Sequence, residues 1–156
     1  MNIEIAGGSP SDIEALQQLW IEYWASLGLP PDFQSFAAER LSLPGAYASP
    51  AGRLLLAGID GEPAGTVAFR PLLERGGACE AKRLYVRPAY RGQGVARALL
   101  ARLIHEARTA GYREMYGDTL SSMQAALQLY HQLGFVDVGP YSPDPTPGAT
   151  YLRLSL

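Results

Sequence analysis

Hydrophobic and polar positions repeat with two different periods along this chain, and the period separates the expected helices from the expected strands. Apolar side chains recur every three or four residues between Pro10 and Gly28, as on the buried face of a helix. Ser9 offers an N-cap, Pro10 suits the first turn, and Gly28 is a typical helix end. The same period predicts helices over residues 33–41, over 94–110, and from Ser121 or Ser122 to about Gly134.

Strands are expected where apolar residues alternate with polar ones or form short runs. Asp60-Gly61 is typical of a tight hairpin turn, Gly76-Gly77 predicts a second turn, and Pro88 ends the strand that follows. Three consecutive antiparallel strands result. The predicted strands cover residues 2–6, 53–59, 64–72, 78–86, 114–119, 135–139 and 150–156. This order of elements predicts the α/β class in the broad sense, an α+β arrangement with a mixed sheet.

Composition indicates a soluble globular protein rather than a disordered or fibrous one. The chain has 156 residues, 47% hydrophobic and 18% charged, which is typical of one soluble domain covering residues 1–156. A net charge of −2 argues against a nucleic-acid partner. The N-terminal stretch shows neither an export signal nor a membrane-spanning segment, so we expect no membrane partner and a cytoplasmic location. The single cysteine, Cys79, excludes an intramolecular disulfide and fits a reducing compartment.

The segment K-R-L-Y-V-R-P-A-Y-R-G-Q-G-V-A-R-A-L-L, residues 82–100, carries the clearest chemical signal. It runs from a strand through a glycine-containing loop into a helix. The first amides of a helix lack internal partners and lie at the positive end of its dipole, so they suit a phosphate. Gly92 and Gly94 allow close approach of the backbone. A local basic cluster adds charge for a small anionic ligand, through Lys82, Arg83, Arg87, Arg91 and Arg97.

The glycine loop fits other interpretations less well. Two glycines between a strand and a helix make a plain turn in many proteins, because G-x-G alone is a weak motif. A dinucleotide-binding loop calls for a small residue where this chain has Arg97, and for repeated βαβ units rather than three antiparallel strands. A P-loop would continue with Gly-Lys-Ser or Gly-Lys-Thr, which is missing here.

The loop resembles the signature of the GNAT-type acyl-CoA N-acyltransferases. That signature is Arg or Gln, two residues, Gly, one residue, then Gly or Ala, and the six residues 91–96 (R-G-Q-G-V-A) match it fully. A second stretch, A-L-Q-L-Y-H-Q-L-G-F from Ala126 to Phe135, is similar to the family's helix that ends in a tyrosine and a Gly-Phe strand start. Both stretches occur in the family's order and spacing, and the resemblance covers essentially the whole chain.

The resemblance implies a fold and a donor substrate. The expected fold is a mostly antiparallel sheet of about seven strands, splayed between the fourth and fifth, with about four flanking helices. Acetyl-CoA is the expected co-substrate, with its pantetheine arm between strands around Leu84–Val86 and Val136–Val138, and its pyrophosphate on the amides from Gly92 to Ala96. Arg97 is expected to reach a phosphate, with a solvated helix residue as the alternative. The implied carrier-binding residues are Leu84, Tyr85, Val86, Arg91, Gly92, Gln93, Gly94, Val95, Ala96, Arg97 and Tyr130.

Acyl transfer to an amine requires a base, an oxyanion contact and a proton for the departing thiolate. Tyr130 matches the family tyrosine near the thioester sulfur, and a phenol stays protonated at neutral pH; a packed aromatic with a satisfied hydroxyl is the alternative. Glu80 is the candidate base, against a plain exposed or arginine-paired glutamate, and Asp118 is the reserve. A main-chain amide near Val86 is the candidate oxyanion contact. Cys79 is interpreted as a small core thiol rather than a nucleophile.

Neither histidine has a recognisable catalytic partner, and we expect no metal site. His105 and His131 both fall among polar surface positions. The sequence departs from the family at Met123, seven residues before the tyrosine, where an asparagine often supports the carrier. This departure removes one expected contact with the carrier.

The resemblance implies that the acceptor meets aromatic side chains of the first two helices and the last hairpin, among which Trp24, Phe33 and Tyr141 are the candidate substrate-binding residues. The sequence thus predicts an N-acetyltransferase that moves an acetyl group from acetyl-CoA to a primary amine of a small molecule or peptide by direct transfer in a ternary complex, as a monomer or homodimer. The alternatives are a non-catalytic acyl-CoA sensor that contacts a partner protein, and an unrelated anion-binding domain.

Overall fold

A seven-stranded mixed sheet forms the centre of the chain. The computed structural model describes residues 1–6, 9–28, 36–142 and 145–156. Within them the strands lie in the order β1-β2-β3-β4-β5-β7-β6, and only the β4–β5 pair is parallel. Their bounds are Asn2–Ile5 (β1), Arg53–Ile59 (β2), Glu62–Pro71 (β3), Ala78–Val86 (β4), Glu114–Leu120 (β5), Val136–Val138 (β6) and Ala149–Ser155 (β7). The predicted fold class is confirmed.

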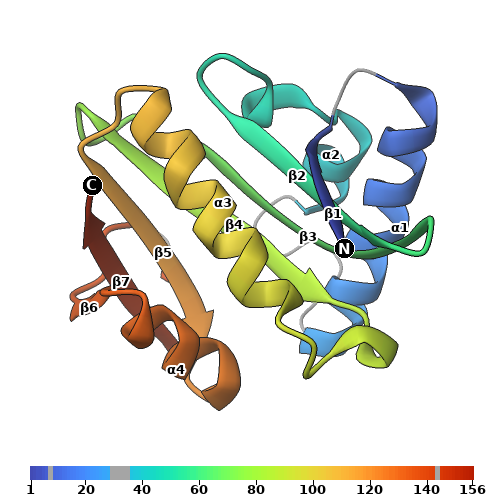
Figure 1. Cartoon of the computed structure of the whole chain (residues 1–156). Helices are drawn as coiled ribbons and strands as arrows, with labels where there is room; N and C mark the ends of the chain where they lie inside the picture. Colours follow the sequence, from blue (N-terminus) through green and yellow to red (C-terminus); the bar gives the residue numbers. More distant parts are fainter. Residues whose placement is uncertain (7–8, 29–35, 143–144) are drawn as a thin grey trace.

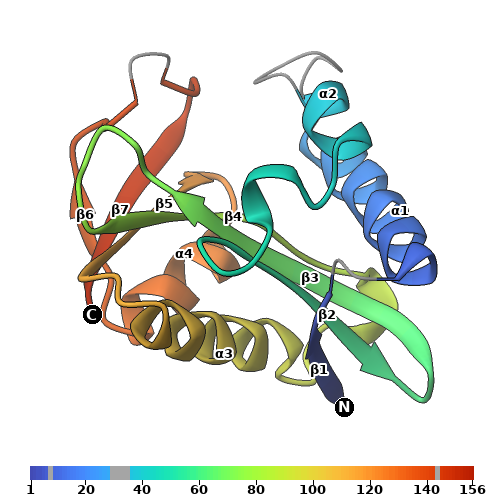
Figure 2. The ribbon, with the colours of Figure 1, turned by 90° about the horizontal axis from the view of Figure 1, so that it is seen from above.

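Four α-helices cover the two faces of this sheet within the described part of the chain. They are α1 (Pro10–Leu27), α2 (Phe36–Leu41), α3 (Val95–Thr109) and α4 (Gln124–Gln132). Helix α3 runs along one face of the sheet, and α1 and α2 cover the other (Figures 1 and 2). Two core clusters follow from this layering: one packs α3 and Tyr130 of α4 onto the strands, and the second packs α1 and α2 onto β2, β3 and β4.

Local sequence signals explain where several elements begin and end. The Ser9 hydroxyl accepts a hydrogen bond from the amide of Asp12 at 3.2 Å, and α1 ends before Gly28 at φ 66°. Between β2 and β3, Asp60 and Gly61 both have positive φ, 52° and 80°. Positive φ at both central residues defines the turn that matches the twist of a hairpin, so the prediction from Asp60-Gly61 is confirmed.

The start of α4 differs from the prediction. The helix begins at Gln124, with Met123 at the cap position and no side-chain cap. Ser121 does not serve as the N-cap because its hydroxyl lies 2.8 Å from the hydroxyl of Thr150 on β7. The predicted helix over residues 33–41 is present from Phe36, and residues 33–35 lie outside the described ones.

The sheet opens between β4 and β5, as expected. These strands pair only from Ala78 to Ala81 on β4 and from Glu114 to Gly117 on β5. Beyond that point β4 carries one more residue than β3 opposite it, and Arg83 has a φ of 63°, so β4 contains a bulge. A bulge bends its strand, so the end of β4 turns away from β5.

One expectation about this opening was wrong. Val136–Val138 (β6) pairs with the outer side of β7 and lies at the edge of the sheet. The second wall of the opening is therefore the end of β5, residues 118–120, because β7 separates β6 from β5.

Candidate active site

The glycine loop ends in an uncapped helix start. Gly94 occupies the N-cap position of α3 with a φ of 81°, and no side chain caps this end of the helix. Gly92 also has positive φ, 77°. The first helical hydrogen bond of α3 runs from the amide of Ala98 to the carbonyl of Gly94 at 3.0 Å. The amides of the three residues before Ala98 therefore precede the internal hydrogen-bond ladder, which is the arrangement that suits a phosphate.

The two arginines of the loop have different surroundings. Arg91 donates from Nε to the carbonyl of Val86 at 2.9 Å and lies over the ring of Tyr85, so it fastens the loop to the end of β4. Arg97 is exposed and donates to the side chain of Gln132 on α4. The side chain of Gln93 turns back to the carbonyl of Ala89 at 3.4 Å.

The Val86 amide points to the open side of β4. Its neighbour Arg87 donates its amide to Ala64 at the end of β3, at 2.9 Å, and successive amides along a strand point to opposite edges. The carbonyl of Val86, which accepts Arg91, lies on the same open edge. This leaves the amide as the group of Val86 that remains for a ligand.

A groove of about 720 Å³ runs past this loop, and we call it the carrier groove. Its walls are the end of β4, the glycine loop, the first turn of α3, and α4. Nine of the predicted carrier-binding residues line it: Leu84, Tyr85, Val86, Arg91, Gly92, Gly94, Val95, Ala96 and Arg97. Of the remaining two, Gln93 is not among the lining residues, and Tyr130 lines the adjoining throat.

The throat is a narrow space of about 50 Å³ between the splayed ends of β4 and β5. It shares Leu84, Met123 and Ala126, among others, with the carrier groove. Tyr130 is buried, and its ring packs edge-on against Phe135 with centroids 5.1 Å apart. Burial, followed by the charges of Tyr23 and Asp118, raises the pKa of Tyr130. No hydrogen bond joins its hydroxyl to another described residue, so the phenol remains a protonated donor.

A second large cavity, of about 710 Å³, lies beyond the throat, and we call it the acceptor cavity. It shares Lys82, Arg83 and Asp118 with the throat, and it has no lining residue in common with the carrier groove. The three spaces therefore adjoin in series, with the throat in the middle.

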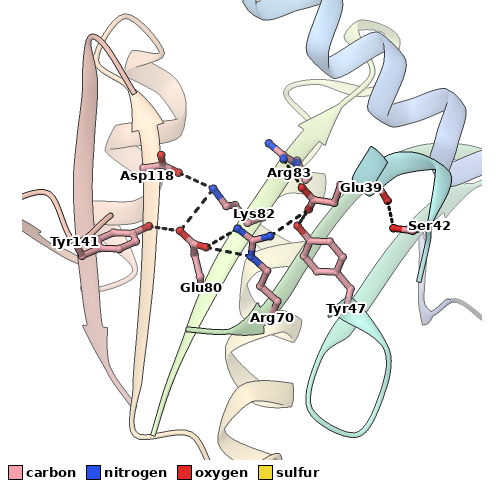
Figure 3. Close-up of polar contacts among 9 residues, drawn as sticks. All are labelled: Glu39, Ser42, Tyr47, Arg70, Glu80, Lys82, Arg83, Asp118 and Tyr141. Carbon is pink, nitrogen blue, oxygen red and sulfur yellow. Dashed lines mark hydrogen bonds and ion pairs between the residues drawn. The ribbon is translucent and has the colours of Figure 1, made fainter. Parts of the chain in front are cut away.

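Glu80 stands at the centre of a polar network in the acceptor cavity (Figure 3). Its carboxylate accepts from Arg70 Nη2 at 3.2 Å and from the Tyr141 hydroxyl at 2.8 Å, and Lys82 Nζ lies 3.6 Å away. Asp118 lies 3.8 Å from the same ammonium and lines both the throat and the acceptor cavity. The arginine-paired glutamate considered for Glu80 is thus present, and Asp118 is the carboxylate nearer to the throat.

The predicted acceptor aromatics are divided between the spaces. Tyr141 lines the acceptor cavity, where burial, then the charge of Glu80, raises its pKa. Trp24 lines the throat and stacks on Phe36 at 4.3 Å. Phe33 lies outside the described residues. The rings of Trp24, Phe36 and Trp20 also surround the Arg83 guanidinium at 5.1, 5.6 and 5.5 Å.

Arg70 was not predicted as a site residue, and Arg83 was predicted only as part of the basic cluster for an anionic ligand, whereas it lines the throat and the acceptor cavity rather than the carrier groove. Arg83 points inward because the bulge changes the alternation of β4, and it donates to Glu39 at 2.9 Å. No local sequence signal predicts that bulge. Arg70 is a different case, because it lies opposite Glu80 in the β3–β4 pairing, and a correct register would have placed it there.

The remaining candidates are structural. Cys79 is buried, and burial raises the pKa of its thiol to about 12, so it is not a thiolate at neutral pH. His131 lies on the surface with Nε2 2.6 Å from an oxygen of Asp137. The described residues contain no cluster of three or more His, Cys, Asp or Glu residues arranged to hold a metal ion. Met123 lines both the throat and the carrier groove.

Comparisons with known proteins agree with this geometry. Residues 13–135 match the acetyltransferase (GNAT) family. An uncharacterized N-acetyltransferase of Schizosaccharomyces pombe is 34% identical over 94% of this chain and 90% of its own length. An IAA acetyltransferase of Azospirillum brasilense is 35% identical over 92% and 93%. A solved acetyltransferase structure from Salmonella typhimurium, with acetyl-CoA, has 25% identity, a TM-score of 0.76, and coverage of 98% and 93%.

The chain therefore belongs to the acetyltransferase (GNAT) family. The carrier groove and the glycine loop lie within the matched residues, as does Tyr130. Among the helices that the structure describes, none combines the length and the apolar character needed to cross a bilayer.

Proposed function

We propose that this protein transfers an acetyl group from acetyl-CoA to a primary amine of a small molecule or a peptide, with both substrates bound at once. The observation that carries the proposal is the series of three adjoining spaces. The carrier groove and the acceptor cavity share no lining residue, and the throat with Tyr130 and Asp118 joins them. Membership of the family and the resemblance to a structure that holds acetyl-CoA support the same donor.

The donor would bind through the backbone at two places. The pyrophosphate oxygens would accept hydrogen bonds from the uncapped amides at the start of α3. The pantetheine arm would lie along the open edge of β4, where it would pair with the backbone as an added strand does. Arg97 at the rim of the groove would add charge. This placement brings the thioester to the throat.

The transfer itself needs one bond to form and one to break. The amine nitrogen attacks the thioester carbon, the carbonyl oxygen becomes an oxyanion facing the Val86 amide, and the carbon–sulfur bond then breaks. Tyr130 donates its proton to the leaving sulfur. The amine proton passes to a carboxylate, directly or through a water, and then returns to the Tyr130 phenolate, which restores both groups. We favour Asp118 over Glu80 for this step because Asp118 lines the throat, while Glu80 already accepts from Arg70 and Tyr141.

A thiol-release assay tests the proposal. Purified protein is incubated with acetyl-CoA and a panel of primary amines, amino acids and short peptides, and free CoA is followed together with the mass of the product. Amine-dependent release with a mass increase of one acetyl group is the expected result. Binding of acetyl-CoA in a calorimeter with no release for any acceptor would favour the non-catalytic sensor, and absence of binding would refute both.

A further inference from the structure

Lys82 is the only lysine of the chain, and its ammonium group has an unusual environment. The side chain is 7% exposed and lines both the throat and the acceptor cavity. Its two carboxylate neighbours, Glu80 and Asp118, lie at 3.6 and 3.8 Å, beyond the usual length of an N–H···O hydrogen bond. No described residue accepts a hydrogen bond from it. The two carboxylates stabilise the ammonium at ion-pair distance, and a ligand in the cavity can supply the hydrogen-bond acceptor that the described residues do not.

The spacing between Lys82 and Asp118 matches a particular ligand. In an α-amino acid the ammonium and the carboxylate are attached to the same carbon, so they lie about one ion-pair distance apart, as do these two side chains. Placed head to tail, the ligand carboxylate would contact Lys82 and the ligand ammonium would contact Asp118. This arrangement puts the reactive nitrogen on the Asp118 side, which lines the throat.

We propose that the Lys82–Asp118 pair recognises the α-amino-carboxylate group, and that the acceptor of this enzyme is a free amino acid. The proposal rests on the proposed acetyl transfer and names its substrate class. The ligand carboxylate accepts hydrogen bonds from the Lys82 ammonium, and Asp118 holds the ligand ammonium, takes one of its protons and passes it to water before the attack. Attack by the neutral amine then proceeds as described above.

The charges around the pair disfavour the other acceptor classes. Three positive side chains, Arg70, Lys82 and Arg83, and three negative ones, Glu74, Glu80 and Asp118, line the acceptor cavity, so a ligand that carries charge of one sign only, such as a polyamine, meets like charge as well as opposite charge. Asp118 and Glu80 add negative charge beside Lys82 and oppose an acid without an amine. A simple monoamine would leave the Lys82 ammonium without its missing acceptor. A zwitterion meets complementary charge at both ends.

The single lysine permits a direct binding test. Protein labelled with ¹⁵N only in lysine side chains gives one ammonium signal, from Lys82, in the wild-type chain. With CoA present, each proteinogenic L-amino acid is titrated in turn, followed by the amine obtained by removing its carboxylate. At least one amino acid is expected to shift the Lys82 signal to saturation, and its decarboxylated partner is not. The proposal is overturned if no amino acid shifts the signal, or if the amine shifts it equally.

A kinetic test uses the ratio of kcat/KM for an amino acid to that for its decarboxylated amine. One hydrogen-bonded charge contact corresponds to a preference of roughly 10- to 100-fold in the wild type. Lys82→Met should bring the ratio close to one, whereas Lys82→Arg should keep part of the preference. Arg108→Met, which removes an exposed positive charge from α3, is the matched control and should leave the ratio as it is. If the wild-type kcat/KM for the amino acid is close to that for its decarboxylated amine, the proposal is refuted, and this outcome does not depend on whether Lys82→Met folds.

The two tests separate this inference from the proposed function. Absence of thiol release with every amine and amino acid would refute acetyl transfer, while the Lys82 signal would still report whether amino acids bind. Release with monoamines at the same efficiency as with amino acids would uphold the enzyme and refute its substrate class.

Discussion

The sharpest test of the mechanism is the removal of one oxygen atom, in Tyr130→Phe. The ring of Tyr130 is buried and packs against Phe135, and the substitution keeps that packing. The hydroxyl makes no hydrogen bond to a described residue, so its loss breaks no hydrogen bond within the described part of the chain. The free energy of unfolding should therefore change by less than about 1 kcal/mol.

The catalytic cost should be much larger than the structural one. A positioned proton donor contributes about 10²- to 10⁴-fold to a rate, equivalent to roughly 3–5 kcal/mol of activation free energy. Because Tyr130 lines the throat rather than the carrier groove, CoA should bind Tyr130→Phe with nearly the wild-type Kd. Because burial holds the pKa of Tyr130 above its ordinary value, the donor stays protonated, and the wild-type rate should show no basic limb due to this group up to about pH 10.

The assay is kcat from thiol release at saturating acetyl-CoA, with Kd from calorimetry and stability from urea unfolding. Tyr112→Phe is the matched control, because Tyr112 lines none of the three spaces. In the wild type the Tyr112 hydroxyl donates a hydrogen bond to the carbonyl of Ala51 at 2.6 Å. That variant should lose about 1 kcal/mol of stability and none of its turnover. A kcat for Tyr130→Phe within threefold of wild type would refute the proton-donor role.

Three further perturbations probe the loop, the base and the alkaline limit. Gly94→Ala places a side chain at a position with φ 81° and open space around it, so the cost is backbone strain of about 1–2 kcal/mol rather than a clash. This strain at the loop should weaken CoA binding roughly tenfold, measured by calorimetry. The control is Gly111→Ala, at φ 91° beyond the other end of α3, which should lower Tm without changing the Kd for CoA. Asp118→Asn should lower kcat about 10²-fold or more, and a larger loss in Glu80→Gln would reverse the assignment of the base. Burial and, second, a neighbouring carboxylate raise the pKa of Tyr47. Above pH 10 this tyrosine therefore ionises in the unfolded state but not in the folded state, and the free energy of unfolding falls as the pH rises. Tyr47→Phe should reduce this fall by up to about 1.4 kcal/mol per pH unit, measured by urea unfolding at several pH values.

Local signals carried most of the fold prediction. The Ser9 cap, the Asp60-Gly61 turn and the glycine loop each act within a few residues, so the sequence alone locates them. The start of α4 was misplaced because the Ser121 hydroxyl lies against Thr150, a partner 29 positions away. Long-range pairing of this kind leaves no trace in the neighbouring sequence.

The polar site was harder to predict for the same reason. Glu80 and Lys82 are neighbours on one face of β4, but Asp118 reaches Lys82 only through the parallel β4–β5 pairing, and Arg70 reaches Glu80 only through the register of β3 and β4. A shift of one residue in either register would turn these side chains to the opposite face. Arg83 adds a second difficulty, because a non-glycine residue at φ 63° is costly and no local pattern predicts it.

The β4–β5 pairing, which we call the seam, divides the sheet into an N-terminal part (β1 to β4) and a C-terminal part (β5 to β7). Four residue pairs join them, whereas β5 pairs with β7 over all seven of its residues. Strands β5, β6 and β7 therefore form a unit that backbone pairing joins to the rest of the sheet at one end of β4 only. The carrier groove and the acceptor cavity both include residues from the unpaired ends of β4 and β5, so the place where the pairing stops decides how much backbone each of the two spaces receives.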